Sequence, residues 1–157
     1  MNALRIAATL AVALIIDSLI GHYSSQGRIY LDPLTVVVVY VALKRSPTAG
    51  MLSGSVAGLM QDAFSAQLLG VSSLGKTIVG YAVGELSIKL DVRSTVFLFP
   101  LILVVSLAEN GLAILLDRIL GIPPIFPART ALFISIGNAG AGTAIIKLVE
   151  RLRPRRR

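Results

Sequence analysis

The side chains that could carry acid–base chemistry in this chain lie within apolar sequence. Five ionisable residues interrupt the apolar stretches: Asp17, Lys76, Glu85, Glu109 and Asp117. Three of them fall near the ends of their stretches, where water is within reach. Lys76 can extend its amine outward, whereas Glu109 must face protein or a wet cavity. We predict either a Lys76–Glu109 ion pair or a protonated Glu109 that hydrogen-bonds to a neighbouring helix.

These side chains are not accompanied by a pattern typical of a catalytic or metal site. The single histidine, His22, is expected in an outer loop, without a second ligand or a general-base partner nearby in sequence. The chain contains no cysteine, which excludes disulfides, thiol nucleophiles and thiolate metal sites. Ser53, Ser55, Ser72 and Ser73 lack the G-x-S-x-G elbow of hydrolases, so we expect them to pack or to donate hydrogen bonds. We therefore expect neither an enzyme nor a bound metal or cofactor.

A glycine-rich segment predicts close helix packing next to two polar residues. Gly50, Gly54 and Gly58 recur every four residues and therefore share one face of a helix. Without side chains, such a face lets a second helix approach closely within a bilayer. Gln61 and Asp62 follow where this helix should leave the hydrocarbon, and polar groups at that depth meet water or another helix. The glycine face packs either against the chain's own helices or against the membrane helix of a partner.

The composition indicates an integral-membrane protein. Hydrophobic residues make up 55% of the 157 residues and charged residues 15%, and the mean hydropathy is +0.81. The apolar segments are separated by very short loops, and no other segment is long enough to build a soluble core. We predict an all-α polytopic protein, with residues 1–150 as one membrane domain and residues 151–157 as a basic cytoplasmic tail. Its six predicted membrane helices, several of them short, cover residues 3–20, 33–43, 46–62, 71–90, 94–120 and 127–151.

The starts of the two short helices carry the clearest local signals. Asp32-Pro33 and Ser46-Pro47 each place a capping side chain before a proline at the first helical position. At ~1.5 Å per residue, the helix over residues 33–43 crosses only about half of a ~30 Å hydrocarbon core. The bilayer must therefore thin at this helix, or neighbouring helices must cover its ends.

The distribution of basic residues predicts the orientation in the membrane. With both termini in the cytoplasm, eleven Lys and Arg residues fall in inside regions and three in outside loops. Five of the eleven are the tail arginines: Arg151, Arg153, Arg155, Arg156 and Arg157. Much of the net charge of +7 thus lies in a tail that suits the anionic lipids of a cytoplasmic leaflet, and nucleic acid is not expected as a partner.

The order of several short motifs resembles that of one protein family. The motifs are Asp32-Pro33-Leu34 opening a VVVVY helix, Gly54-x-x-x-Gly58-Leu59-x-Gln61-Asp62, Leu69-Gly70 and Gly80-Tyr81. Taken in this order they resemble the rod shape-determining protein MreD family, over most of the chain and most strongly between residues 32 and 84. We expect Gly70, Gly80 and Tyr81 to act with the glycine face, Gln61 and Asp62 in helix packing or partner contact.

The resemblance implies a function in the bacterial inner membrane. It implies a non-enzymatic scaffold of the cell-elongation machinery that binds the bitopic protein MreC. Such a scaffold would support peptidoglycan synthesis by a RodA-type glycosyltransferase and its transpeptidase partner, a class B penicillin-binding protein. The resemblance also implies a six-helix fold similar to that of the substrate-binding subunits of energy-coupling-factor vitamin transporters.

That fold similarity raises an alternative function, a membrane subunit that binds a vitamin-like solute for such a transporter. Ala7-x-x-x-Ala11 resembles the small-residue pattern with which these subunits meet their coupling partner, although such patterns are common in membrane helices. A vitamin site should also present several aromatic and polar groups from outer loops. The predicted outer loops are short and the chain has no tryptophan, which favours the scaffold.

Overall fold

The described part of the chain is entirely helical. The computed structural model describes residues 3–23, 31–64, 70–89, 94–121 and 128–152, which form six α-helices and no strand. The predicted helix number and class are therefore confirmed for these residues. The helices are α1 (Ala3–Tyr23), α2 (Pro33–Lys44), α3 (Pro47–Phe64), α4 (Val71–Lys89), α5 (Thr95–Ile119) and α6 (Ala128–Leu152).

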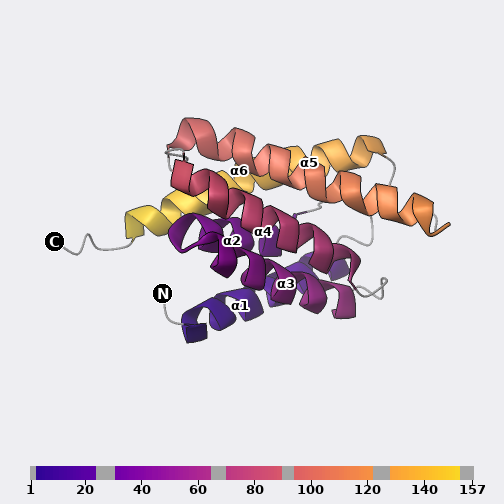
Figure 1. The fold of residues 1–157 in the computed structure, drawn as a ribbon, viewed down its shortest axis with the longest axis horizontal. Coiled ribbons are helices and arrows are strands. Elements are labelled where there is room, and N and C mark those ends of the chain that lie inside the picture. Colours follow the sequence, from indigo (N-terminus) through magenta and orange to yellow (C-terminus); the bar gives the residue numbers. More distant parts are fainter. Residues whose placement is uncertain (1–2, 24–30, 65–69, 90–93, 122–127, 153–157) are drawn as a thin grey trace.

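The short helix α2 lies at the centre of the bundle. It contacts each of the other five helices, whereas α1 contacts only α2 and α3. Figure 1 shows α5 and α6 side by side along one edge of the bundle and α1 along the opposite edge. Of the 12 residues of α2, eight are buried, and they include four valines. The ends of this short helix are thus covered by its neighbours, one of the two solutions expected from its length.

Both predicted helix starts are confirmed by their capping bonds. The carboxylate of Asp32 accepts the backbone N–H of Thr35 at 3.0 Å, with Pro33 at the first helical position of α2. The hydroxyl of Ser46 accepts the backbone N–H of Ala49 at 3.2 Å, directly before α3. Since each cap satisfies an N–H that has no partner within its own helix, these starts are fixed by local sequence.

The glycine face of α3 packs against α4. A β-carbon placed on Gly54 would lie 2.1 Å from the carbonyl oxygen of Lys76, and one placed on Gly50 would lie 2.2 Å from that of Gly80. At Gly58 the β-carbon would lie 2.2 Å from the Cα of Ser73. Backbone thus meets backbone along the whole face, which only glycine permits. This contact places the glycine face inside the protein and leaves it no room for a helix from another molecule.

The outer surface is apolar and the interior contains polar side chains. Large hydrophobic residues such as Phe97, Val104 and Phe133 are more than half exposed, while Lys76 and Asn138 are buried. Two helices are long and apolar enough to cross a membrane, over Val96–Ile119 in α5 and Arg129–Leu152 in α6. An apolar exterior, with the charged and polar groups of the helices turned inward, is the arrangement expected where the surrounding solvent is lipid.

Two sequence-based placements need correction or fall outside the described residues. His22 lies in the last turn of α1 and not in an outer loop, because the helix continues for one turn beyond the apolar run that marked its predicted end. Arg151 is exposed in the last turn of α6. The other tail arginines, Arg153, Arg155, Arg156 and Arg157, lie outside the described residues.

Candidate functional site

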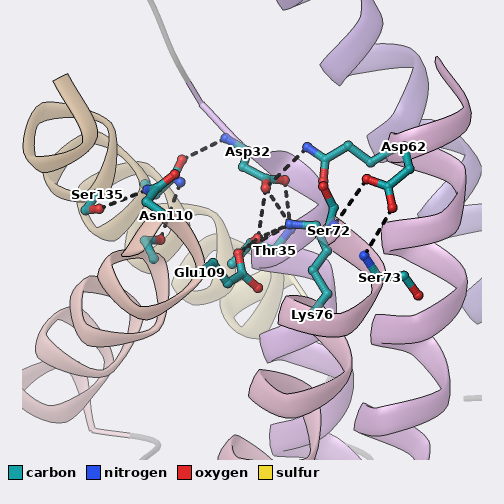
Figure 2. A network of polar contacts seen from close by, with 12 residues as sticks. Asp32, Thr35, Asp62, Ser72, Ser73, Lys76, Glu109, Asn110 and Ser135 are labelled. Carbon is teal, nitrogen blue, oxygen red and sulfur yellow. Dashed lines mark hydrogen bonds and ion pairs between the residues drawn. The ribbon is translucent and has the colours of Figure 1, made fainter. Parts of the chain in front are cut away.

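The buried amine of Lys76 is the centre of a polar network between the helices. This α4 side chain is only 3% exposed. Its Nζ donates to Asp32 Oδ2 at 2.5 Å, to Thr35 Oγ1 at 2.6 Å and to Glu109 Oε2 at 3.3 Å (Figure 2). An ammonium group has three N–H donors, so each of them has an acceptor. The network joins the start of α2, the first half of α4 and the second half of α5.

The structure brings the predicted partners Lys76 and Glu109 together and adds a closer one. Asp32 was identified from sequence only as a helix cap, yet it also forms the shorter of the two ion pairs with Lys76. The sequence did contain a signal for this contact. Asp32 directly precedes α2, Lys76 lies in the first half of α4, and both helices were predicted to begin on the same side of the membrane. A buried cation needs a nearby carboxylate, and one at the neighbouring helix start was available.

Two carboxylates share the hydrogen-bond donors of this network. Thr35 Oγ1 lies 3.0 Å from Asp32 Oδ2 and 2.5 Å from Glu109 Oε2. A hydroxyl has a single proton, so Thr35 donates to one of the two carboxylates at a time. The second oxygen of Glu109, Oε1, is buried and has no hydrogen-bond partner among the described residues. The site is therefore richer in acceptors than in donors.

Polar residues of α5 and α6 extend the network. The side-chain oxygen of Asn138 accepts the backbone N–H of Asp32 at 2.8 Å, and its amide group donates to Ser106 at 3.4 Å. Asn110 donates to the hydroxyl of Ser135 at 3.2 Å. Sequence reasoning missed Asn138, Ser106 and Ser135, because small polar residues within apolar helices have many possible orientations. Their contacts tie α6 to α2 and α5 by hydrogen bonds within the bundle.

A cavity of about 120 Å³ lies beside this network. Gln61, at the C-terminal end of the glycine face, lines it and donates to Asp32 Oδ2 at 3.4 Å. Most of the lining residues have polar side chains, and Val71, Ala113 and Ile114 add apolar surface. The lining residues are Asp32, Gln61, Val71, Ser72, Gly75, Lys76, Glu109, Asn110, Ala113, Ile114 and Asp117.

Asp62 caps a helix other than its own. It is 1% exposed at the end of α3, and its carboxylate accepts the backbone N–H of Gly70 at 2.7 Å. The same carboxylate accepts the backbone N–H groups of Ser72 at 3.2 Å and Ser73 at 3.4 Å (Figure 2). These groups belong to the turn before α4 and to its first turn, where backbone N–H groups have no partner within the helix. Two surroundings were predicted for Asp62, water or another helix. In the structure its carboxylate contacts another helix, at the start of α4. Gly70 bends this turn with a φ of 107°.

Replacing Asp62 with alanine is expected to lower the free energy of unfolding by about 2–3 kcal/mol, because the N–H groups at the start of α4 lose their acceptor. Asp62→Asn retains one acceptor oxygen and should cost about 1 kcal/mol. Both values can be measured by titrating SDS into mixed micelles and following the far-UV circular dichroism. Equal stability of Asp62→Ala and the wild type would show that this cap contributes nothing.

The remaining predicted residues take different positions. Gly80 lies in the α3–α4 contact opposite Gly50. Tyr81 is 46% exposed and donates to Glu85 Oε1 at 3.3 Å, so it faces outward from this contact. Asp17 is half-buried on α1, and Asp117 lines the cavity. Among the described residues, no group of three histidine, cysteine, aspartate or glutamate side chains could hold a metal ion.

Comparison with known proteins identifies one family. The family model of rod shape-determining protein MreD matches residues 2–123. The match includes Asp32, Asp62, Lys76 and Glu109 and ends before α6. We found no match among curated proteins and none among solved structures.

Proposed function

The chain belongs to the rod shape-determining protein MreD family, and from this premise we propose that it is a non-enzymatic membrane scaffold of the bacterial cell-elongation machinery. In this proposal it binds MreC and supports peptidoglycan synthesis by a RodA-type glycosyltransferase and a class B penicillin-binding protein. The observation that carries the proposal is the family match over residues 2–123. The family has a role in rod shape determination and is associated with the membrane.

The internal architecture supports a scaffold. The close α3–α4 packing and the hydrogen-bond network around Lys76 both lie inside the protein. Together they connect the five helices from α2 through α6. Such a body presents its outer faces without first rearranging, which reduces the entropic cost of binding a partner. A partner's membrane helix would then contact the exposed apolar faces, since the glycine face is covered by α4.

We also propose a six-span topology in the inner membrane with both termini in the cytoplasm. The start of α1 and the end of α6 lie at the same end of the bundle (Figure 1). Lys44 at the end of α2 pairs with Glu150 near the end of α6 at 2.6 Å. This contact fits the proposal, in which both helix ends face the cytoplasm beside anionic lipids. A fold similar to that of energy-coupling-factor substrate-binding subunits is part of the same proposal.

The cavity beside Lys76 is smaller than the site that a vitamin-binding transporter subunit needs. Sites for small organic molecules usually have volumes of about 300–1,000 Å³. The cavity beside Lys76 measures about 120 Å³, which is too small to enclose a vitamin.

A mild-detergent pull-down of the tagged full-length chain from its native membrane tests the proposal. We expect MreC to be recovered together with the glycosyltransferase and the penicillin-binding protein. Recovery of paired ATPases and a coupling subunit would instead indicate the transporter function. A tagged membrane protein of similar size and unrelated family serves as the control for non-specific recovery.

A further inference from the structure

The contacts around the hydroxyl of Thr35 need more protons than the donors of the network supply. Thr35 is fully buried. Its Oγ1 lies 2.6 Å from the amine of Lys76, which supplies the proton of that contact. The two other contacts join oxygen to oxygen, at 3.0 Å to Asp32 Oδ2 and at 2.5 Å to Glu109 Oε2. Each needs a proton and the hydroxyl has only one, so one proton is missing when both carboxyl groups are ionised.

The donors that reach each carboxyl group indicate which of them holds the missing proton. Asp32 already accepts from the Lys76 amine and the Gln61 amide, and its other oxygen accepts a backbone N–H. Within the described ranges, Glu109 Oε2 accepts only from Lys76, at the longer distance of 3.3 Å, and the buried Oε1 has no donor. An oxygen without a donor is costly in a buried carboxylate and less so in a neutral acid. The proton therefore belongs on Glu109.

The charge balance of the interior favours the same assignment. Two charged groups act on Glu109, Lys76 of α4 and Asp32 before α2. They already form an ion pair at 2.5 Å, so an ionised Glu109 would add a negative charge that nothing balances. From α6, the neutral side chains of Ser135 and Asn138 contact this part of α5. A largely buried carboxyl group without its own counter-charge is more stable when it is protonated.

Glu109 has a route for proton exchange through the cavity. Its side chain is 12% exposed and lines the cavity together with Asn110 and the titratable Asp117 of the same helix. A volume of about 120 Å³ is large enough for several water molecules. Water at this place both delivers a proton to Glu109 and removes it.

We propose that the network is a proton-binding site, in which Glu109 Oε2 carries a proton and donates it to Thr35 Oγ1. Thr35 then donates its own proton to Asp32 Oδ2, and every contact of the hydroxyl contains one proton. Release of the bound proton to water makes Glu109 a second, longer ion-pair partner of Lys76 and leaves one oxygen–oxygen contact without a proton. The contact of α5 with α2 and α4 therefore depends on pH. The proton site is independent of the proposed function.

Infrared spectroscopy of the purified full-length chain detects the proton directly. A protonated carboxyl group has a C=O stretching band that a carboxylate lacks, and ¹³C labelling of glutamate shifts this band away from that of aspartate. The chain has three glutamates, and Glu85 and Glu150 each lie near a lysine and are more exposed than Glu109.

We expect the labelled band at neutral pH in dodecyl maltoside micelles, which contain no carbonyl group. The band should disappear in Glu109→Gln and persist in Glu85→Gln, the matched control at an exposed carboxylate. A wild-type spectrum without the labelled band would overturn the proposal. If Glu109→Gln does not fold, the labelled band of the wild type and its loss at alkaline pH decide alone.

The pH dependence of stability provides a second test. Above about pH 5 a glutamate in water is ionised, so the unfolded chain binds one proton fewer than the folded one. The free energy of unfolding should therefore decrease as the pH rises, until the folded protein also loses the proton of Glu109. Over that interval the unfolding equilibrium constant of the wild type should rise, relative to that of Glu109→Gln, by up to about tenfold per pH unit. A ratio that stays constant with pH would contradict the proton site.

Two substitutions compare the carboxyl groups at neutral pH. Glu109→Gln keeps a neutral side chain of similar size with an N–H donor for Thr35, so the unfolding equilibrium constant should change by less than about threefold. Asp32→Asn removes the charge that balances Lys76 and should raise the constant by about tenfold or more. An equally large effect of Glu109→Gln would mean that Glu109 is ionised too, and the proposal would be wrong.

Discussion

Replacing Lys76 with methionine is expected to lower the free energy of unfolding by about 3–5 kcal/mol. The reason is electrostatic, because Asp32 and Glu109 lie 2.5 Å and 3.3 Å from the amine and would be left without a cation. Removing one partner of a buried ion pair costs more than the pair itself contributes, since the remaining charge is poorly solvated. SDS titration followed by circular dichroism, with the protein in mixed micelles, measures the loss.

A second substitution separates charge from packing. Adding Asp32→Asn to Lys76→Met removes one of the stranded charges and keeps an oxygen that can cap α2, so about 1–3 kcal/mol should be recovered. Lys89→Met is the matched control, because Lys89 is 73% exposed and its pair with Glu85 at 3.9 Å is worth about 0.5 kcal/mol or less. If Lys76→Met were as stable as Lys89→Met, the network would not stabilise the fold.

Replacing Gly54 with alanine is expected to destabilise the protein by at least about 3 kcal/mol. The added methyl group would lie 2.1 Å from the carbonyl oxygen and 2.6 Å from the carbonyl carbon of Lys76. Backbone atoms cannot rotate away as a flexible side chain does, so α3 and α4 must separate. The separation would also displace Lys76 from its network. The fraction of monodisperse protein on size-exclusion chromatography and the SDS unfolding midpoint should both decrease.

The matched control for this substitution is Gly140→Ala on α6. Nothing lies within 4 Å of a β-carbon at Gly140, so the same chemical change meets no clash and should leave stability unchanged or raise it by up to about 1 kcal/mol, because alanine favours the helix over glycine. Comparing the two variants in the MreC pull-down also separates folding from partner contact. A Gly54→Ala protein that folds like the wild type but no longer recovers MreC would mean that this face contacts the partner, contrary to the packing on α4.

The sequence by itself determined the elements and several of their properties. Six helices, the capped starts at Asp32-Pro33 and Ser46-Pro47, and the need for a close contact at the glycine face all follow from residues near one another in the chain. Capping and close approach are local requirements of the backbone, so short patterns suffice to reveal them. The need of Glu109 for protein or a wet cavity around it was also predicted, whereas Lys76 was expected to be able to extend its amine outward, because a charge in apolar sequence is costly when it is alone.

Only the tertiary structure decided which groups meet. The Lys76 amine contacts Asp32, 44 residues away in sequence, and the backbone of Asp32 contacts Asn138, 106 residues away. The same applies to the choice of α4 as the partner of the glycine face and to the role of Asp62 at the start of α4. Many pairings of six helices satisfy the same local rules. The native pairing is selected by packing the whole bundle at once, and the cavity beside Lys76 exists only as a result of that packing.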